Sequence, residues 1–436
     1  MDVLINQGAE AIIENLEESG FSAYITGGAV IEYLLDKPIS SVHISTSASP
    51  QEIIALFPDY INVDNITKTV TVLKNQTGYE ISTFKKAPST FGITPDVYDD
   101  LSLASFTIDA IAYNKRDSFL DFFGGVDDIN KKQIRVLLDA DELFSKNPSE
   151  MLRAIRLSAT LGFTIEPSTE KAIRKYSVFS KHIPYNVQLE EYNKILMSSA
   201  PLKGFSLLYE LGLLKHLMPA LNRCFSVQQK NKYHIYNVGE HIMHALDNTP
   251  KDITLRWAAL LHDIGKPNCS SCDSNGIIHF YGHHRESMKI ADGILNALHL
   301  DRNLIHDILL LIEYHDVRIE ATLPAIKRLL SKIGDTLFTK LLILQEADAQ
   351  AKNPLYINEK LEKTKALRSL LHTIIEEGHP YKVSDLAINA RDLMKLKYKA
   401  GRQINDTLRV LLEDVILNPS LNNHVYLLNK AKNLRK

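Results

Sequence analysis

The chain has 436 residues, of which 45% are hydrophobic and 23% charged, so it can bury several cores and we expect two to four domains. Its formal net charge of −2 provides no overall field to attract nucleic acid, so any RNA binding would depend on a local basic patch. Three cysteines make a disulfide framework improbable, so we expect the protein to lie in the reducing cytoplasm. No apolar run is long enough to span a bilayer, so we expect no membrane association.

The N-terminal third is expected to be a mixed α/β region. The first 20 residues carry acids throughout and apolar residues at helical spacing, which favours an amphipathic helix and not a signal peptide. Short β-rich runs then predict six strands, at residues 22–26, 42–44, 69–73, 79–84, 106–113 and 118–123. Polar segments at 75–78 and 114–117 are typical of hairpin turns. From about residue 139 the periodicity is helical, so a helical body follows.

Residues 25–50 have the layout of a nucleotide-binding segment, with a strand, a Gly-Gly turn, a helix and a second strand. Gly27 and Gly28 form the turn. The second strand, "SVHIS", has no carboxylate, although magnesium that holds a nucleoside triphosphate prefers oxygen anions as ligands. The segment therefore predicts a nucleotide-binding fold that lacks its metal ligands.

Ten of the sixteen histidines lie between His234 and His315, a concentration that needs a cause. Five segments supply histidines and carboxylates, namely "GEHIMH", "LLHDIGK", "YGHHRES", "IEYHD" and "QEADAQ". A single histidine is most often a satisfied core or surface side chain, but "HDIG" within an apolar helix buries charge that must be compensated. The segments together predict a metal site whose ligands are His241, His262, Asp263, His283, His315 and Asp348.

The donor set also indicates the metal and the chemistry. Imidazole together with carboxylate suits Fe, Mn, Ni, Co or Zn, whereas an all-oxygen set would favour Mg or Ca. Two such ions would hold a hydroxide for in-line attack on phosphorus, so we expect two ions and hydrolysis of a phosphate ester. The expected catalytic residues are Asp263, which could bridge the ions, Lys266, which could contact phosphate, and Asp316. The rival pair at 306–307 lies about half a helical revolution from His315 and is not expected to face the same site.

The ordered set of His, His-Asp, His, His and Asp over about residues 234–348 resembles an HD-domain metal phosphohydrolase. The presence of all six positions implies the binuclear form of that domain. A mononuclear form with four ligands is the alternative.

Nearly the whole chain is similar to the bacterial CCA-adding tRNA nucleotidyltransferases of the poly(A)-polymerase-like class. The similarity rests on "ITGGAV", on "FGGVDDI" and on C-terminal helices that begin at "DLAINARDLM". It implies an α+β fold, with a small mixed-sheet nucleotidyltransferase head of the polymerase-β-like type followed by an elongated all-helical body that includes the HD domain. Four parts are expected: a head at 1–137, a helical neck at 138–218, the HD domain at 219–360 and a helical tRNA-binding-like tail at 361–436.

Part of the transferase machinery is kept and part is replaced. In the family the Gly-Gly turn, here Gly27 and Gly28, holds triphosphate through backbone N–H groups, and the neck arginines Arg153 and Arg156 are also present. The replaced positions are Ser41 and His43 in the Asp-x-Asp motif, Ser105 in the Arg-Arg-Asp-Phe-Thr motif, and Lys146, Asn147 and Glu150 in the Glu-Asp-x-x-Arg motif that reads the incoming base. Serine and histidine offer magnesium neither charge nor hard oxygen anions, so magnesium is not expected in the head. The joint loss predicts a head that no longer transfers nucleotides.

The sequence thus predicts a cytoplasmic homologue of the CCA-adding enzymes whose HD domain hydrolyses a phosphate ester of a nucleotide or an RNA 3′ end, with tRNA as a further partner. In CCA enzymes that carry an HD domain, the resemblance implies 2′,3′-cyclic phosphodiesterase and phosphatase activities. Two alternatives are kept. The head could be an active transferase with an atypical metal site, or the chain could be a non-catalytic RNA-binding or regulatory protein.

Overall fold

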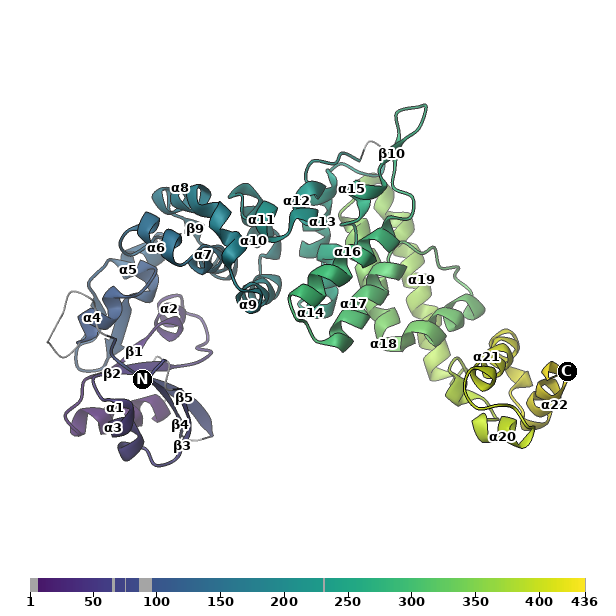
Figure 1. The fold of residues 1–436 in the computed structure, drawn as a ribbon, viewed down its shortest axis with the longest axis horizontal. Helices are drawn as coiled ribbons and strands as arrows, with labels where there is room; N and C mark the ends of the chain where they lie inside the picture. Colours follow the sequence, from purple (N-terminus) through teal and green to yellow (C-terminus); the bar gives the residue numbers. More distant parts are fainter. Residues whose placement is uncertain (1–6, 65–66, 75, 86–95, 230–231, 436) are drawn as a thin grey trace. The chain divides into compact units, whose positions relative to one another are not determined.

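The structure is a computed structural model that describes residues 7–64, 67–74, 76–85, 96–229 and 232–435 (Figure 1). The chain divides into two compact units. The N-terminal unit comprises residues 1–187 and 210–216, and the C-terminal unit comprises residues 188–209 and 217–436. Among the described residues, no helix is both long and apolar enough to cross a membrane.

The N-terminal unit is built on a seven-stranded sheet in the order β3-β4-β5-β2-β1-β6-β7. Its strands are β1 (Ala23–Thr26), β2 (His43–Thr46), β3 (Tyr60–Asp64), β4 (Thr69–Lys74), β5 (Thr77–Thr83), β6 (Ile111–Asn114) and β7 (Ser118–Asp121). Strands β2 and β5 run parallel, with His43 opposite Glu80, whereas the other neighbours are antiparallel. The mixed sheet expected from the sequence is confirmed.

Helices precede, connect and follow these strands along the chain. They are α1 (Gln7–Glu18), α2 (Gly28–Leu34), α3 (Pro50–Leu56), α4 (Val97–Ser102), η1 (Thr107–Asp109), α5 (Gly125–Asn130), α6 (Ala140–Lys146), α7 (Ser149–Leu161), α8 (Pro167–Tyr176) and η2 (Ser177–His182), with a short strand pair β8 (Gln133–Ile134) and β9 (Thr164–Ile165). The amphipathic helix expected at the N-terminus is α1, which buries Ile12, Ile13 and Leu16. The unit therefore has the α/β head that the sequence indicates.

Two strand predictions were wrong in detail. β3 was missed because its residues are exposed or half-buried along their whole length and show no alternation. The run at 106–113 is not one strand, since η1 interrupts it before β6 begins. Thr107 turns the chain there: its hydroxyl donates to Asp128 Oδ2 at 2.5 Å and its backbone N–H donates to the Arg135 carbonyl at 3.0 Å.

The C-terminal unit is a helical bundle followed by smaller helices. Its elements, together with the three that span the division, are α9 (Tyr185–Leu196), α10 (Pro201–Glu210), α11 (Leu214–Leu217), α12 (Pro219–Cys224), α13 (Val238–Asp247), α14 (Ile253–Leu261), α15 (Lys266–Cys269), α16 (His283–Ala297), α17 (Arg302–Tyr314), α18 (Leu323–Gln350), η3 (Pro354–Tyr356), α19 (Ile357–Glu376), η4 (Val383–Asp385), α20 (Ala390–Lys395), α21 (Arg402–Leu417), η5 (Pro419–Leu421) and α22 (His424–Leu434). A two-stranded hairpin, β10 (Ser271–Cys272) with β11 (Ile278–His279), interrupts the helices.

Helix α14 forms the centre of the bundle. Every residue from Thr254 to Leu261 is buried, and the helix packs against α13, α17 and α18. Asp252 caps its N-terminus by accepting a hydrogen bond from the Leu255 N–H at 3.0 Å. A helix that is buried on all sides lies inside a core, so the residues that follow Leu261 emerge in the interior of the bundle.

Candidate metal centre

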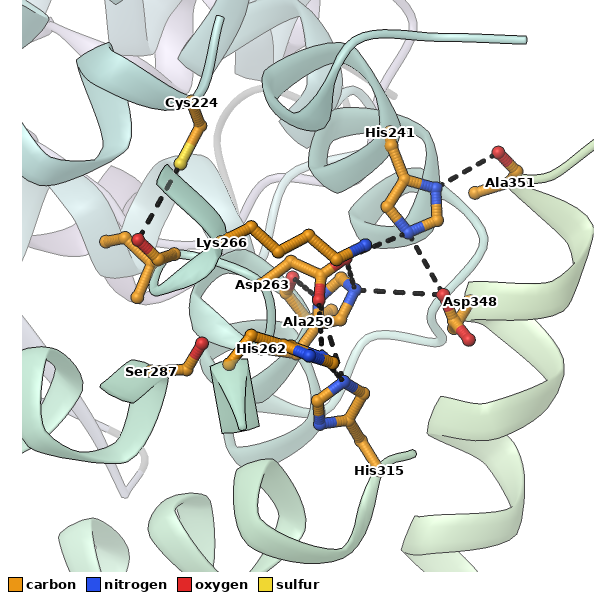
Figure 2. A network of polar contacts seen from close by, with 12 residues as sticks. Cys224, His241, Ala259, His262, Asp263, Lys266, Ser287, His315, Asp348 and Ala351 are labelled. Atoms are coloured by element: carbon orange, nitrogen blue, oxygen red, sulfur yellow. Dashed lines mark hydrogen bonds and ion pairs between the residues drawn. The ribbon is translucent and has the colours of Figure 1, made fainter. Parts of the chain in front are cut away.

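Five segments bring six predicted ligands together in the interior of the C-terminal unit. Figure 2 labels five of them, namely His241, His262, Asp263, His315 and Asp348. His241 lies on α13, His262 and Asp263 follow the last residue of α14, His283 is the first residue of α16, His315 follows α17, and Asp348 lies near the end of α18. All six side chains are buried. We call this group the histidine–aspartate centre. Helix ends supply most of its members, because a chain that leaves a buried helix can turn a polar side chain toward its neighbours.

A backbone carbonyl fixes the orientation of each of the four histidine rings. The ring Nδ1 atoms pair with carbonyl oxygens, in the pairs His241–Ala351 at 3.1 Å, His262–Ala259 at 2.7 Å, His283–Phe280 at 2.9 Å and His315–Ile312 at 2.7 Å. A carbonyl only accepts hydrogen bonds, so each Nδ1 must donate. In the neutral ring this leaves Nε2 without a proton, as a metal ligand requires.

Asp263 connects two groups of ligands. Its Oδ2 atom lies 3.3 Å from Nε2 of His241 and 3.2 Å from Nε2 of His262. Its Oδ1 atom lies 3.3 Å from Nε2 of His283 and 3.6 Å from Nε2 of His315. One carboxylate therefore faces two histidine pairs with different oxygens.

Asp348 completes the first of these groups. Its Oδ1 atom lies 3.0 Å from Nε2 of His241 and 3.8 Å from Nε2 of His262. Donor atoms of His241, His262 and Asp348 all lie within 4.8 Å of one another, and so do those of His262, Asp263 and His315. His262 belongs to both sets.

Three buried polar atoms of the centre have no hydrogen-bond partner among the described residues: Nε2 of His241, Nε2 of His262 and Oδ1 of Asp263. Leaving such atoms unpaired in a core costs about 1–3 kcal/mol each. A cation between them would satisfy all three. The residues present therefore fit a divalent metal, and the mixture of imidazole and carboxylate fits a transition metal.

The charges of the centre support the same interpretation. Burial alone would raise the pKa of Asp263, but His262 and Lys266 hold it well below its ordinary range. Burial also tends to raise the pKa of Asp348, but Lys352 and His241 outweigh it and hold that pKa well below its ordinary range. Both side chains are thus carboxylates, the form that binds metal.

A cavity of about 360 Å³ opens onto the centre. The two other predicted catalytic residues line it. Lys266 is buried, with Nζ 2.6 Å from Oδ2 of Asp263 and donating to Oε1 of Gln229 at 2.8 Å. Asp316 is exposed at the rim. The rival His306 is exposed on α17 and away from the centre, as its spacing indicates.

Two residues of the cavity were not predicted as functional. Lys352 donates to Oδ2 of Asp348 at 2.7 Å. It lies just after the end of α18, four residues beyond Asp348, and this spacing could have revealed it. His234 also lines the cavity, and burial together with Lys266 lowers its pKa to about 2. His234 lies before α13, where no periodicity indicates which way a side chain points.

Gly265 allows the centre to close. A Cβ atom at this position would lie 2.4 Å from the backbone nitrogen of Ser287 and 2.8 Å from the carbonyl oxygen of His283. The Gly265 N–H also donates to the Ser287 hydroxyl at 2.9 Å. The glycine of "HDIG" therefore lets the backbone approach α16 and bring His283 to Asp263.

The predicted nucleotide site of the N-terminal unit keeps its glycine turn but has no carboxylate at Ser41 or at His43. Gly27 has φ 73°, so the Gly-Gly turn adopts the conformation that favours glycine. Ser41 is exposed. The His43 ring is occupied by neighbours: Nε2 lies 2.8 Å from the Ser82 hydroxyl and Nδ1 lies 3.6 Å from Oε2 of Glu80. Ser105 is half-buried next to the start of η1.

The three neck replacements contact one another or their own helices. Nζ of Lys146 lies 2.5 Å from Oε1 of Glu142. The amide of Asn147 donates to Oε1 of Glu150 at 3.5 Å, and Nη1 of Arg153 lies 3.3 Å from Oε2 of Glu150.

One kept arginine of the neck, Arg153, pairs with a buried acid of the head. Nη2 of Arg153 lies 2.8 Å from Oδ2 of Asp109. Burial raises the pKa of Asp109, and Arg153 and Arg156 oppose this increase. Both arginines therefore stabilise a carboxylate of their own chain.

Three family models match successive parts of the chain. Residues 23–135 match the poly A polymerase head domain, residues 162–225 match the probable RNA and SrmB-binding site of polymerase A, and residues 232–353 match the HD domain.

Curated relatives and solved structures agree with these matches. The CCA-adding enzyme of Bacillus cytotoxicus is 37% identical over 217 residues, which are 48% of this chain and 55% of the relative. That of Bacillus cereus strain AH820 is 33% identical over 270 residues, which are 60% of this chain and 65% of the relative, so these matches span less than two thirds of either relative.

Two solved structures share the fold. The Bacillus stearothermophilus CCA-adding enzyme in complex with CTP has a TM-score of 0.76 at 24% identity, with 98% of this chain and 97% of that chain covered. The Thermotoga maritima CCA-adding enzyme complexed with tRNA has a TM-score of 0.58 at 21% identity, with 100% and 98% covered.

The chain thus combines matches to a poly A polymerase head domain, to the probable RNA and SrmB-binding site of polymerase A and to an HD domain in one polypeptide. It is a homologue of the CCA-adding enzymes, and the fold class expected from the sequence is confirmed.

Proposed function

We propose that this chain is a metal-dependent phosphohydrolase whose HD domain acts on a phosphate ester of a nucleotide or of an RNA 3′ end. The observation that carries the proposal is the convergence of four histidine Nε2 atoms on the two oxygens of Asp263, beside an open cavity. Bound Fe, Mn, Ni, Co or Zn would supply Lewis acidity and activate water for attack on phosphorus. The two groups of donors that share Asp263 support two ions.

The chain's own residues have distinct roles in this proposal. His241, His262 and Asp348 would hold one ion, and His283 and His315 the second, with Asp263 between them. The amines of Lys266 and Lys352 border the cavity and favour the negative charge of a phosphate. Asp316 is exposed on the same cavity, where a carboxylate can exchange a proton with the leaving oxygen.

Full-length protein loaded separately with each of the five metals tests the proposal. The substrates are 2′,3′-cyclic nucleotides, nucleoside monophosphates and a short RNA with a 3′-terminal phosphate. We expect metal-dependent hydrolysis of at least one of them, and loss of that activity in Asp263→Ala. Equal activity in Asp263→Ala, or none with any metal, would remove the proposal.

We further propose that the head no longer transfers nucleotides. Ser41 has no charge, and the His43 ring is taken by Ser82 and Glu80. Without carboxylates at these two positions, a magnesium ion lacks the oxygen anions on which phosphoryl transfer depends. Contacts of Lys146, Asn147 and Glu150 within the neck support the same interpretation.

Nucleotide addition to tRNA is a second candidate function. It is favoured by the 37% identity to a curated CCA-adding enzyme and by the kept turn at Gly27. Incubating the purified chain with tRNA that lacks CCA and with labelled CTP or ATP separates the two. Incorporation above a control without enzyme would show an active transferase with an atypical metal site.

The four-part organisation, with boundaries near residues 137, 218 and 360, belongs to the same proposal, as do a tRNA partner and a cytoplasmic location. The match of residues 162–225 to an RNA-binding family model supports the RNA partner. So does the fold shared with a CCA-adding enzyme that was solved with tRNA.

A further inference from the structure

A second, larger cavity adjoins the one that opens onto the histidine–aspartate centre. Its volume is about 580 Å³, and it lies between the turn after α17, the end of α18 and the first half of α19. His234, Asp316 and Lys352 line both cavities, so the two meet at these side chains. A ligand that reaches the centre can therefore continue into this neighbouring space, which we call the side cavity.

Two tyrosines form one wall of the side cavity. Tyr233 precedes α13 and Tyr356 ends η3, and their ring centroids are 5.0 Å apart at an interplanar angle of 68°. Both are partly exposed, at 48% and 41% of their surface. Tyrosine rings that keep so much surface at the edge of a cavity offer a π-face on which a nucleobase can stack.

The backbone holds this aromatic wall in place. The Asn353 N–H donates to the Tyr233 carbonyl at 2.9 Å, and the Asn353 amide donates to the Lys232 carbonyl at 2.9 Å. The Lys232 ammonium lies 5.1 Å from the centroid of the Tyr233 ring and 5.4 Å from that of the Tyr356 ring. The wall is thus preformed, because three separate contacts connect the segment before α13 to the segment after α18.

The charged residues that line the side cavity are mostly cations. Arg318, Lys352, Lys360 and Lys363 line it, against two acids, Asp316 and Glu359. Lys352 is committed to Asp348 at 2.7 Å. For the other three cations, no carboxylate of the described residues lies within ion-pair distance. Cations that lack acidic partners and face a cavity favour a polyanionic ligand.

A single phosphate does not explain both features. The histidine–aspartate centre, with Lys266 and Lys352, already provides for the phosphate that reacts. The aromatic wall adds a place for a base, and Lys360 and Lys363, on the first two turns of α19, add a place for another negative charge. A polynucleotide end carries a reacting terminal phosphate, a base and a second phosphate in sequence, whereas a mononucleotide lacks the last of these.

We infer that the side cavity is a subsite for a polynucleotide, in which the terminal base stacks on Tyr356 and Tyr233 and the preceding phosphate lies against Lys360 and Lys363. This inference rests on the proposed hydrolysis and specifies its substrate as an RNA 3′ end, in preference to a free nucleotide.

Hydrolysis of three substrates by the full-length, metal-loaded protein tests the subsite. They are a dinucleotide with a 3′-terminal phosphate, a mononucleoside 3′-phosphate and p-nitrophenyl phosphate. We expect kcat/KM to be at least about tenfold higher for the dinucleotide than for the mononucleotide. Tyr356→Ala should lower kcat/KM for both nucleotides by roughly 10- to 100-fold, and leave p-nitrophenyl phosphate within about twofold. Tyr356→Phe, which keeps the ring, should behave as the wild type.

A matched pair of lysines tests the second phosphate. Lys363 lines the side cavity, whereas Lys365 is exposed on the same helix and does not. Lys363→Ala should lower kcat/KM for the dinucleotide several-fold and weaken its dependence on salt, with no change for the mononucleotide. Lys365→Ala should change neither.

A binding measurement separates this inference from the proposed hydrolysis. A dinucleotide that carries 4-thiouridine is photo-crosslinked to the full chain in the presence of a chelator, and the modified peptide is identified by mass spectrometry. We expect the crosslink on segments that contain Tyr233 or Tyr356. Crosslinking there, combined with no hydrolysis by the metal-loaded protein in the preceding assays, would leave the subsite standing and remove the phosphohydrolase.

Two results would overturn the subsite itself. One is hydrolysis of the dinucleotide that Tyr356→Ala leaves unchanged, with crosslinks that map only to other segments. The other is an equal loss of all three substrates in Tyr356→Ala, because a purely structural tyrosine would affect p-nitrophenyl phosphate as much as RNA.

Discussion

Oδ1 of Asp263 lies 3.3 Å from Nε2 of His283, on the side of the carboxylate opposite to the oxygen that faces His262. The two histidines come from segments 21 residues apart, since one follows α14 and the other begins α16. Asp263 is thus the one acid of the centre whose two oxygens face different histidine pairs. Its removal should disturb both groups of ligands.

Asp263→Asn should abolish binding of both ions. The amide presents one neutral oxygen and one N–H₂ donor in place of two anionic oxygens, so it cannot serve both histidine pairs. We expect the metal content of the dialysed full-length protein, measured by elemental mass spectrometry, to fall to well under one equivalent. Phosphate-ester hydrolysis should fall on the order of 100-fold or more. Asp307→Asn, on α17 outside the centre, is the matched control and should retain both properties. Two equivalents of metal in Asp263→Asn would contradict this role.

Gly265→Ala should destabilise the C-terminal unit, because a Cβ atom there would meet backbone atoms of Ser287 and His283 at 2.4 and 2.8 Å. Overpacking of this kind costs about 1–3 kcal/mol. Gly293, within α16, provides a control of opposite sign: a Cβ atom there meets nothing within 4 Å, and alanine should stabilise the helix by about 0.5–1 kcal/mol. Urea unfolding of the two variants measures the difference. A Gly265→Ala protein as stable as Gly293→Ala would show that α16 can move away without cost.

The sequence was sufficient to predict which histidines and aspartates the fold brings together at the centre, but not what surrounds them. His262 and Asp263 directly follow a run of apolar, buried residues, Trp257 to Leu261, so they emerge inside a core and need polar partners there. The spacing of Lys352 from Asp348 could have indicated Lys352. His234 was not predicted because its place beside the centre depends on how segments far apart in the sequence pack together. The wall formed by Tyr233 and Tyr356 was not predicted for the same reason, since only tertiary packing brings the two ring centroids within 5.0 Å of each other.

The limits of prediction in the N-terminal unit have another origin. β3 is exposed or half-buried throughout, so the alternation that identifies a half-buried strand is absent. The mixed sheet itself could be predicted because its central strands are strongly apolar. β1 and β6 are buried at every position, and the loop between β6 and β7 carries the expected turn residues.

Arg153→Ala should destabilise the N-terminal unit in the absence of any nucleotide. It would leave the buried Asp109 without the guanidinium that lies 2.8 Å away. Because Arg153 is 31% exposed, the cost should be about 1–3 kcal/mol, below that of a fully buried pair. Asp109→Asn introduced into Arg153→Ala should restore part of the loss, since it removes the uncompensated charge.

Urea unfolding of the two single variants and the double variant forms a double-mutant cycle for this pair. Lys131→Ala removes an exposed pair with Asp127 and should leave the stability close to that of the wild type. Additive effects of the Arg153 and Asp109 substitutions would contradict a structural role. Arg153 would then have a role in binding a ligand and not in stabilising the fold.

The pH dependence of stability should reveal the state of His43. Burial lowers its pKa below the ordinary value of 6.5, Lys85 acts in the same direction, and Glu80 and Asp100 oppose the shift without reversing it. The unfolded chain therefore binds a proton near pH 6.5 that the folded chain does not bind. The stability linked to His43 should be fully present above pH 6.5. It should be lost as the pH falls from 6.5 toward the lower pKa of the folded state.

Urea unfolding of wild type and His43→Gln between pH 8 and pH 5 measures this contribution. The difference in unfolding free energy between the two should shift against the wild type as the pH falls below 6.5. His372→Gln, exposed on α19 in the C-terminal unit, should leave the pH dependence of the N-terminal unit unchanged. A difference that moves in favour of the wild type on acidification would mean that His43 is protonated and paired with Glu80. A protonated ring at this position would support the proposed loss of nucleotide transfer more strongly than a neutral ring, because a cation repels magnesium.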